Sequence, residues 1–150
     1  MNTNTITTIY FDMDGTLADF YSVKNWLESL ENFDTHPYEA ARPLVDFRIL
    51  ARLLNNLQKN GYRLGIVSWG SRTSTPEFME NVRRAKKKWL AKHLPSVFWD
   101  EIHIVKHGTP KHLIVKDRNG ILFDDEEKNR ERWTGRAENV DNILEILRSL

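Results

Sequence analysis

Cysteine is absent from this chain of 150 residues, so neither a disulfide framework nor a thiolate metal site is possible. No apolar run is long enough to span a bilayer, and the polar segment at residues 1–8 shows no basic part followed by an apolar part, the pattern of a signal peptide. A formal net charge of +1 indicates neither a polyanion-binding protein nor an acidic tail. With 40% hydrophobic residues, the sequence predicts one soluble domain, residues 1–150, and we expect it in the cytoplasm, away from membranes.

Short apolar segments alternate with helical patterns along the chain. The predicted strands are residues 9–11, 64–67, 102–105 and 121–123, and the main predicted helices are residues 43–59, 76–93 and 140–150. This alternation predicts an α/β fold, namely a three-layer, Rossmann-like parallel sheet with helices on both faces. Residues from about 20 to about 42 interrupt the alternation and predict a small helical cap insert after the first strand. Pro43 then suits the first turn of the next helix, which Asn60-Gly61 ends.

The segment IYFDMDGT, residues 9–16, combines an apolar strand with two aspartates and a glycine. Because side chains alternate along a strand, Asp12 and Asp14 are expected on the same side, with the backbone carbonyl of Met13 facing whatever they bind. Two like charges so close need a cation, a shared proton or full hydration. The glycine permits a tight turn, and the threonine after it adds a hydroxyl and an N–H. An ordinary Asp-Gly turn at a solvated strand end is the alternative interpretation.

The other polar residues of interest also follow predicted strands, and the carboxyl ends of parallel strands meet at one edge of a sheet. Several carboxylates at one edge need a counter-ion, and oxygen ligands without cysteine indicate a hard cation, Mg²⁺ in particular. A hydroxyl, a lysine in a first helical turn and exposed N–H groups beside it form an anion cradle, which indicates a phosphoryl group. The candidates for phosphate contact are Thr16, Ser68, Trp69 and Lys111, and those for metal contact are Asp12, Asp14, Asp124 and Asp125.

These groups predict covalent phosphoryl chemistry. A carboxylate can attack phosphorus to give an aspartyl-phosphate, which divides one hard step into two. A second carboxylate two residues further on can protonate the leaving oxygen and later deprotonate the attacking water. We expect Asp12, the Met13 carbonyl and Asp124 to bind Mg²⁺ directly. Asp125 is expected either to bind the ion through a water molecule or to contact the direct ligands instead of the ion.

The order of these groups resembles the four-motif signature of the haloacid dehalogenase-like (HAD) hydrolase superfamily: Asp12-x-Asp14-Gly15-Thr16, Ser68, Lys111 and Asp124-Asp125. The resemblance implies that Asp12 is the nucleophile and Asp14 the general acid and base. It also implies that Ser68 and Lys111 hold the phosphate and that Asp124 holds Mg²⁺. Members that act on carbon–halogen bonds usually lack the second aspartate and transport ATPases usually carry lysine there, so Asp14 favours a phosphatase or phosphomutase.

Within the superfamily, the chain looks most like the small 5′(3′)-deoxyribonucleotidase-like phosphatases of bacteria and phages. The matching segments are FDMDGTLAD at 11–19, Trp26-Leu27, PYEA at 37–40 and DDE at 124–126. The implied function is a Mg²⁺-dependent phosphomonoesterase for a nucleotide or another small phosphate ester.

Several assignments stay open. Lys106 competes with Lys111 for the phosphate, although the helix start at Thr109-Pro110 favours Lys111. Trp69 either flanks the phosphate, stacks on a base or only packs. The aromatic residues of the insert form either a nucleobase slot or the core of the insert itself: Phe20, Tyr21, Trp26 and Tyr38.

A strongly basic helix, residues 77–93, is interpreted as a solvated outer face, Lys86 included. Nucleic-acid contact through this helix is the alternative, which gives a polynucleotide end phosphatase as a second candidate. A non-catalytic phosphate- or Mg²⁺-binding regulatory module, comparable to a receiver domain, is a third. In receiver domains the acidic pair comes on the first strand and the single acceptor later, whereas here Asp-x-Asp comes first. Asn129 is expected to hydrogen-bond the acidic motif.

Overall fold

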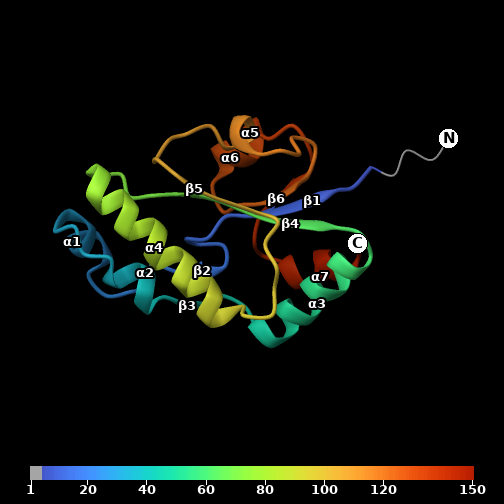
Figure 1. The fold of residues 1–150 in the computed structure, drawn as a ribbon, viewed down its shortest axis with the longest axis horizontal. Coiled ribbons are helices and arrows are strands. Elements are labelled where there is room, and N and C mark those ends of the chain that lie inside the picture. Colours follow the sequence, from blue (N-terminus) through green and yellow to red (C-terminus); the bar gives the residue numbers. More distant parts are fainter. Residues whose placement is uncertain (1–4) are drawn as a thin grey trace.

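A five-stranded parallel sheet forms the centre of the computed structural model, which describes residues 5–150; residues 1–4 of the polar N-terminal segment lie outside the described part. The strand order is β5-β4-β1-β6-β7 (Figure 1). The four predicted strands are confirmed, and a fifth, β7, is too short to show a pattern in the sequence. The strands are β1 Thr8–Phe11, β4 Arg63–Trp69, β5 Glu101–Val105, β6 Ile121–Phe123 and β7 Ala137–Glu138.

Helices cover both faces of the sheet, as predicted (Figure 1). Alternate residues of β1 explain the layers, because Ile9 and Phe11 face one side and Tyr10 the other. The first side packs against α3 Phe47–Lys59, the second half of α4 Pro76–His93, and α7 Ile143–Arg148. The second side is covered by the segments around α5 Lys111–Ile114 and α6 Glu127–Arg132, where Trp133 packs edge-on against Tyr10.

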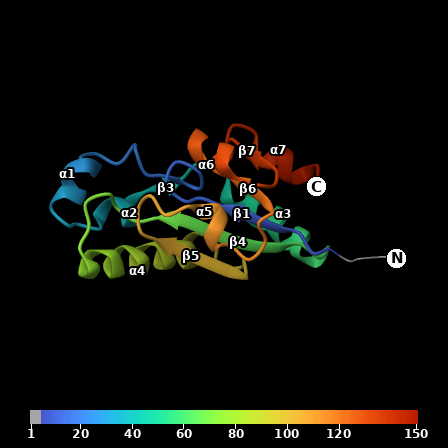
Figure 2. The ribbon, with the colours of Figure 1, turned by 90° about the horizontal axis from the view of Figure 1, so that it is seen from above.

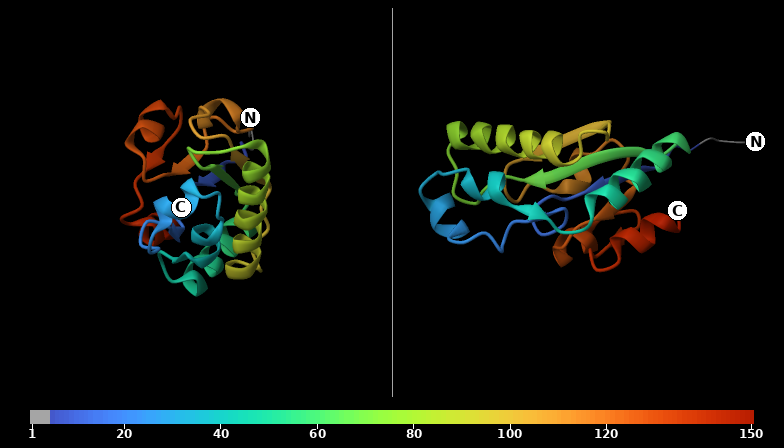
Figure 3. Two further views of the ribbon diagram at one scale, coloured as in Figure 1. Left: turned by 90° about the vertical axis from the view of Figure 1, so that its left-hand side faces the viewer. Right: turned by 90° about the horizontal axis from the view of Figure 1, so that it is seen from below.

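The insert after β1 consists of two short helices, α1 Trp26–Glu31 and α2 His36–Ala40. An antiparallel pair of two-residue strands closes its base, β2 Ala18–Asp19 and β3 Arg42–Pro43. Figures 2 and 3 show α1 and α2 at the end of the molecule toward which the β4 arrow points, opposite the N-terminus. The insert therefore lies next to the carboxyl ends of the strands.

Two predicted helix starts are wrong. Pro43 belongs to β3, and α3 begins at Phe47 after Asp46, whose carboxylate accepts a hydrogen bond from the Arg48 N–H at 2.9 Å. Thr109 does not cap α5, because its hydroxyl donates instead to the Lys106 carbonyl at 2.6 Å.

Two other helix boundaries agree with the sequence. The hydroxyl of Thr75 caps α4 by accepting from the Phe78 N–H at 3.1 Å, and α3 ends before Gly61, which has φ +100°. Within residues 5–150, no helix has both the length and the apolar character that a membrane crossing needs.

Candidate active site

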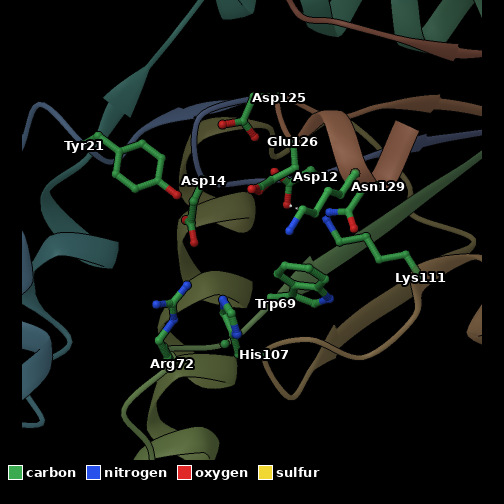
Figure 4. A pocket seen from close by; sticks show the side chains of 12 residues that line it. Asp12, Asp14, Tyr21, Trp69, Arg72, His107, Lys111, Asp125, Glu126 and Asn129 are labelled. Atoms are coloured by element: carbon green, nitrogen blue, oxygen red, sulfur yellow. Dashed lines mark hydrogen bonds and ion pairs between the residues drawn. The ribbon is translucent and has the colours of Figure 1, made fainter. Parts of the chain in front are cut away.

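The aspartates of the first and last motifs meet at the carboxyl ends of β1 and β6. The backbone N–H of Asp12 donates to the Phe123 carbonyl at 2.9 Å, which continues the strand pairing by one residue and brings Asp12 close to Asp124. A cavity of about 340 Å³ opens here, lined by Asp12, Asp14, Lys111 and Asp125 among others (Figure 4). The expectation that polar residues gather at this sheet edge is thus met for these side chains.

Lys111 joins two of the acidic groups. Its ammonium group lies 3.0 Å from Asp12 Oδ1 and 2.7 Å from Asp124 Oδ2. Burial lowers the pKa of Lys111, but the charges of Asp12 and Asp124 outweigh it, so the pKa is raised and the lysine stays charged. Lys106 is exposed at the end of β5. Of the two lysines, Lys111 is the one that the fold places among the carboxylates.

Asp124 is fully buried and held from several sides. Its Oδ2 also accepts from Asn129 Nδ2 at 3.1 Å, which confirms the expected contact of this asparagine with the acidic motif. Its Oδ1 accepts from the Glu126 N–H at 2.9 Å. These partners fix the carboxylate, so a ligand at this site meets a rigid group.

Asp12, Asp124 and Asp125 form the group that could hold a metal ion, since one carboxylate oxygen from each lies within 4.8 Å of the others. Fully ionised, they carry three negative charges against the single positive charge of Lys111. The excess of two matches a divalent cation, and a set of oxygen ligands only suits Mg²⁺. The residues present therefore fit Mg²⁺, the ion that the sequence predicts.

The pKa values in this group follow from burial and mutual repulsion. Burial, together with the charge of Asp12, raises the pKa of Asp124 to about 6 and that of Asp125 to about 8. Burial also acts to raise the pKa of Asp12, but Lys111, a hydrogen bond with Asp125 and the charge of Lys86 outweigh it, so this pKa is lowered. Asp12 is therefore ionised, which is the form in which a carboxylate can act as a nucleophile. A bound cation would stabilise the ionised forms of Asp124 and Asp125 most, because their pKa values are raised.

The carbonyl of Met13 does not face the acidic group, contrary to expectation. It accepts the backbone N–H groups of Thr16, Leu17 and Ala18 at 3.1, 2.9 and 2.9 Å. The turn after β1 closes on this oxygen, because Gly15 adopts φ +79° and folds the chain back. A period-two strand pattern cannot show that the strand stops at Phe11 and that a turn begins two residues later.

Two of the predicted phosphate contacts lie behind the cavity. Thr16 is 1% exposed, and its Oγ1 lies 3.2 Å from Asp12 Oδ2 and 3.4 Å from Asp125 Oδ1. Ser68 is fully buried, and its hydroxyl accepts from Lys86 Nζ at 2.8 Å. Neither residue is among those that line the cavity. Thr16 thus contacts Asp12 and Asp125, whereas Ser68 contacts Lys86, and a contact of either residue with phosphate stays a prediction.

Trp69 and Lys111, by contrast, line the cavity. The indole N–H of Trp69 already donates to the Thr109 carbonyl at 2.8 Å, so it is not free for a phosphate. The ring lies 4.8 Å from the ring of His107, centroid to centroid, and 5.2 Å from the Lys111 ammonium. Trp69 therefore forms a wall that borders the charged groups and holds the loop at Thr109.

Lys86 is expected on the solvated face of the basic helix, but it is 1% exposed and lies on the inner face of α4. Its ammonium donates to Asp14 Oδ2 at 2.9 Å, and Asp14 is not one of the three carboxylates that come within 4.8 Å of one another. The helical spacing of Val82, Lys86 and Trp89 places Lys86 on the inner face, a signal that the surrounding basic run conceals. Burial raises the pKa of Asp14 against the opposing effect of Lys86, which suits a general acid.

A second cavity, of about 430 Å³, continues from the first into the insert. Asp14, Tyr21, Arg72 and His107 border both cavities, and Figure 4 shows the phenol of Tyr21 beside Asp14. The remaining walls of the second cavity are mainly aromatic and aliphatic side chains of the insert: Phe20, Trp26, Leu27, Leu30 and Tyr38.

The aromatic residues of the insert divide between the two expected roles. Phe20 and Tyr38 are buried with ring centroids 4.8 Å apart and form the small core of the insert. Tyr21 is 54% exposed and packs edge-on against Trp26 at 5.1 Å. The core and the cavity wall are thus parts of one cluster.

No protein-family model matches the chain, and no curated protein matches it. Among solved structures, it is similar to a D,D-heptose 1,7-bisphosphate phosphatase from Burkholderia thailandensis, with a TM-score of 0.54 and 10% sequence identity. The match covers 95% of this chain and 97% of the other. At this identity the likeness shows the fold: an α/β Rossmann-like sheet with helices around it.

Proposed function

We propose that this chain is a Mg²⁺-dependent phosphomonoesterase that works through an aspartyl-phosphate on Asp12. The observation that carries the proposal is the meeting of Asp12, Lys111, Asp124 and Asp125 at one cavity, whose wall includes Asp12, Lys111 and Asp125. When fully ionised, the three carboxylates exceed the charge of Lys111 by two. The order of these residues along the chain resembles that of HAD hydrolases, and the fold is shared with a phosphatase. The likeness in fold supports the reaction class only by analogy.

Asp12, Asp124 and Asp125 would hold the metal, and Thr16 keeps two of them in place through its hydroxyl. When bound, Mg²⁺ supplies charge neutralisation at the phosphoryl oxygens. Lys111 supplies a further positive charge on the cavity wall and keeps Asp12 ionised. These groups together would favour a dianionic phosphate ester beside Asp12.

The chain's own residues account for both steps. A carboxylate oxygen of Asp12 forms a bond to phosphorus while the bond between phosphorus and the leaving oxygen breaks, and protonated Asp14 gives its proton to that oxygen. In the second step Asp14 takes a proton from water, whose oxygen bonds to phosphorus as the bond to Asp12 breaks. Inorganic phosphate leaves and both aspartates return to their starting states.

The substrate we propose is a nucleotide or another small phosphate ester with a flat, partly apolar leaving group. The aromatic cavity in the insert supports this, because it begins at Asp14, where the leaving group would lie, and Tyr21 offers an exposed ring for stacking. For a polynucleotide end the case is weaker, because Lys86 points inward and the Arg83 side chain bonds the Ile104 carbonyl at 2.9 Å.

A substrate screen tests the proposal. Purified protein is incubated with nucleoside monophosphates, alkyl phosphates, p-nitrophenyl phosphate and a 5′-phosphorylated oligonucleotide, with and without Mg²⁺. We expect phosphate release that requires Mg²⁺, and the mass of one phosphoryl group on the peptide containing Asp12 after acid quenching. Asp12→Asn should abolish both, whereas Asp141→Asn, at an exposed aspartate outside both cavities, should change neither. Turnover in Asp12→Asn would exclude the covalent mechanism.

A further inference from the structure

Lys86 is a buried cation that the proposed reaction does not yet use. Its ammonium group donates three hydrogen bonds, to the Trp69 carbonyl at 2.6 Å, to Ser68 Oγ at 2.8 Å and to Asp14 Oδ2 at 2.9 Å. An ammonium group has three N–H donors, so all of them are used. The group also lies 5.1 Å from the centroid of the Tyr38 ring, within the range of a cation–π contact.

The partners of Lys86 differ in their place in the fold. Ser68 and the carbonyl of Trp69 belong to β4, a central strand, so they are fixed points in the sheet. Asp14 lies in the turn after β1 and borders both cavities. The lysine therefore connects a central strand to a carboxylate in a turn. Neither Lys86 nor Ser68 lines either of the two cavities described above, and Lys86 lies between Ser68 and Asp14 through its hydrogen bonds.

We infer that Lys86, anchored on Ser68 and Trp69 of β4, is a positioning residue that holds the Asp14 carboxylate where the leaving group of the substrate meets the aromatic cavity. This inference rests on the proposed function, because it takes Asp14 as the acid and base. It assigns Ser68 a part in the anchor in place of direct phosphate contact. It also explains why Lys86 points into the protein although it belongs to the run of basic residues on α4.

The inference predicts a loss that depends on the leaving group. An alkoxide must be protonated as it leaves, whereas p-nitrophenolate is stable enough to leave without a proton. Misplacement of Asp14 should therefore slow the first step for an alkyl phosphate and spare it for p-nitrophenyl phosphate. A defect in folding or in phosphate binding would slow both esters alike.

The test is single-turnover kinetics of Lys86→Met with both esters, measured as alcohol or p-nitrophenol released in the first turnover. We expect a loss of about 10²-fold for the alkyl phosphate, the size that a misplacement of about 1 Å can cause, and less than about threefold for p-nitrophenyl phosphate. Lys87→Met, at the exposed neighbour on the same helix, is the matched control and should leave both rates unchanged. Should Lys86→Met fail to fold, Lys86→Gln is measured in its place.

A double-mutant cycle provides the second readout. If Lys86 acts through Asp14, Lys86→Met should add less than about threefold to the loss already caused by Asp14→Asn. Equal losses for the two esters, or losses that multiply in the double variant, would overturn the inference while leaving the proposed function intact. A wild-type chain that releases phosphate from neither ester would overturn the proposed function and this inference with it.

Discussion

The ammonium group of Lys111 lies 2.7 Å from the carboxylate of Asp124, and both side chains are almost completely buried. The two residues are 13 positions apart, one on the single-turn helix α5 and the other just after β6. Their contact joins two of the predicted motifs, Lys111 before β6 and Asp124-Asp125 directly after it. It also means that each of the two charges depends on the other for its stability in the interior.

Removal of the Lys111 ammonium group should lower the stability of the fold. Lys111→Met leaves Asp124 and Asp12 without their shared partner, so we expect the free energy of unfolding to fall by about 3–5 kcal/mol near neutral pH without Mg²⁺. Urea denaturation followed by circular dichroism measures this. Lys106→Met removes an exposed lysine nearby and should change the value by less than about 0.5 kcal/mol. Equal effects of the two substitutions would contradict the structural role given to Lys111.

Gly15 gives a second test of the acidic group. It has φ +79°, and a Cβ atom at this position would overlap the carboxylate of Asp125. Gly15→Ala should therefore cost about 1–2 kcal/mol for the backbone and, in addition, weaken Mg²⁺ binding by displacing Asp125. Gly61→Ala is the matched control, since Gly61 has φ +100° but nothing within 4 Å of the added atom. Calorimetric titration with Mg²⁺ should separate the two variants, and equal affinities would show that Asp125 is not a ligand.

The sequence predicts the sheet and the meeting of the aspartates, because both follow from simple patterns. Apolar runs such as 64–67 mark buried strands, and Asp12 and Asp124 follow two strands that turn out to be neighbours. The topology of a parallel sheet then brings them together whatever the loops do.

Features that depend on rotation about a helix axis or on turn closure are not predicted. Lys86 lies among basic residues that conceal its place in the helical spacing, and its burial and its contacts with Asp14 and Ser68 show that its long side chain reaches inward. The Met13 carbonyl is used by the turn after β1, and Pro43 pairs with Ala18 in a strand because the insert has to close at its base. Such contacts arise from tertiary structure, which overrides local preference.

The aromatic cavity can be tested through Tyr21, whose ring is exposed and borders both cavities. Stacking of a base on an aromatic ring contributes about 1–3 kcal/mol, so Tyr21→Ala should raise KM for a nucleoside monophosphate about 5- to 150-fold. KM for glycerol phosphate, which has no ring, should change less than about twofold. Phe98→Ala removes another exposed ring, 69% accessible and outside both cavities, and serves as the control. Equal changes for both substrates would exclude stacking at Tyr21.

The dependence of stability on pH and Mg²⁺ tests the acidic group as a whole. The pKa of Asp124 is raised from the ordinary 3.8 to about 6, and that of Asp125 from 3.8 to about 8. Between about pH 4 and about pH 8, the folded protein therefore binds more protons at these two groups than the unfolded chain does. Through these two groups, stability without Mg²⁺ should therefore fall as the pH rises from about 4 to about 8. Mg²⁺ binds the deprotonated carboxylates, so the stabilisation it gives should grow over the same range.

Thermal unfolding at about pH 6 and about pH 9, each with and without Mg²⁺, measures both effects. We expect a clearly larger rise in Tm from Mg²⁺ at the higher pH, and Asp125→Asn should reduce the difference between the two pH values. Asp141→Asn, which removes an exposed carboxylate, should preserve it. An equal rise in Tm at both pH values would mean that Mg²⁺ binding is not linked to the protons of Asp124 and Asp125, and the assignment of this group as the metal site would fail.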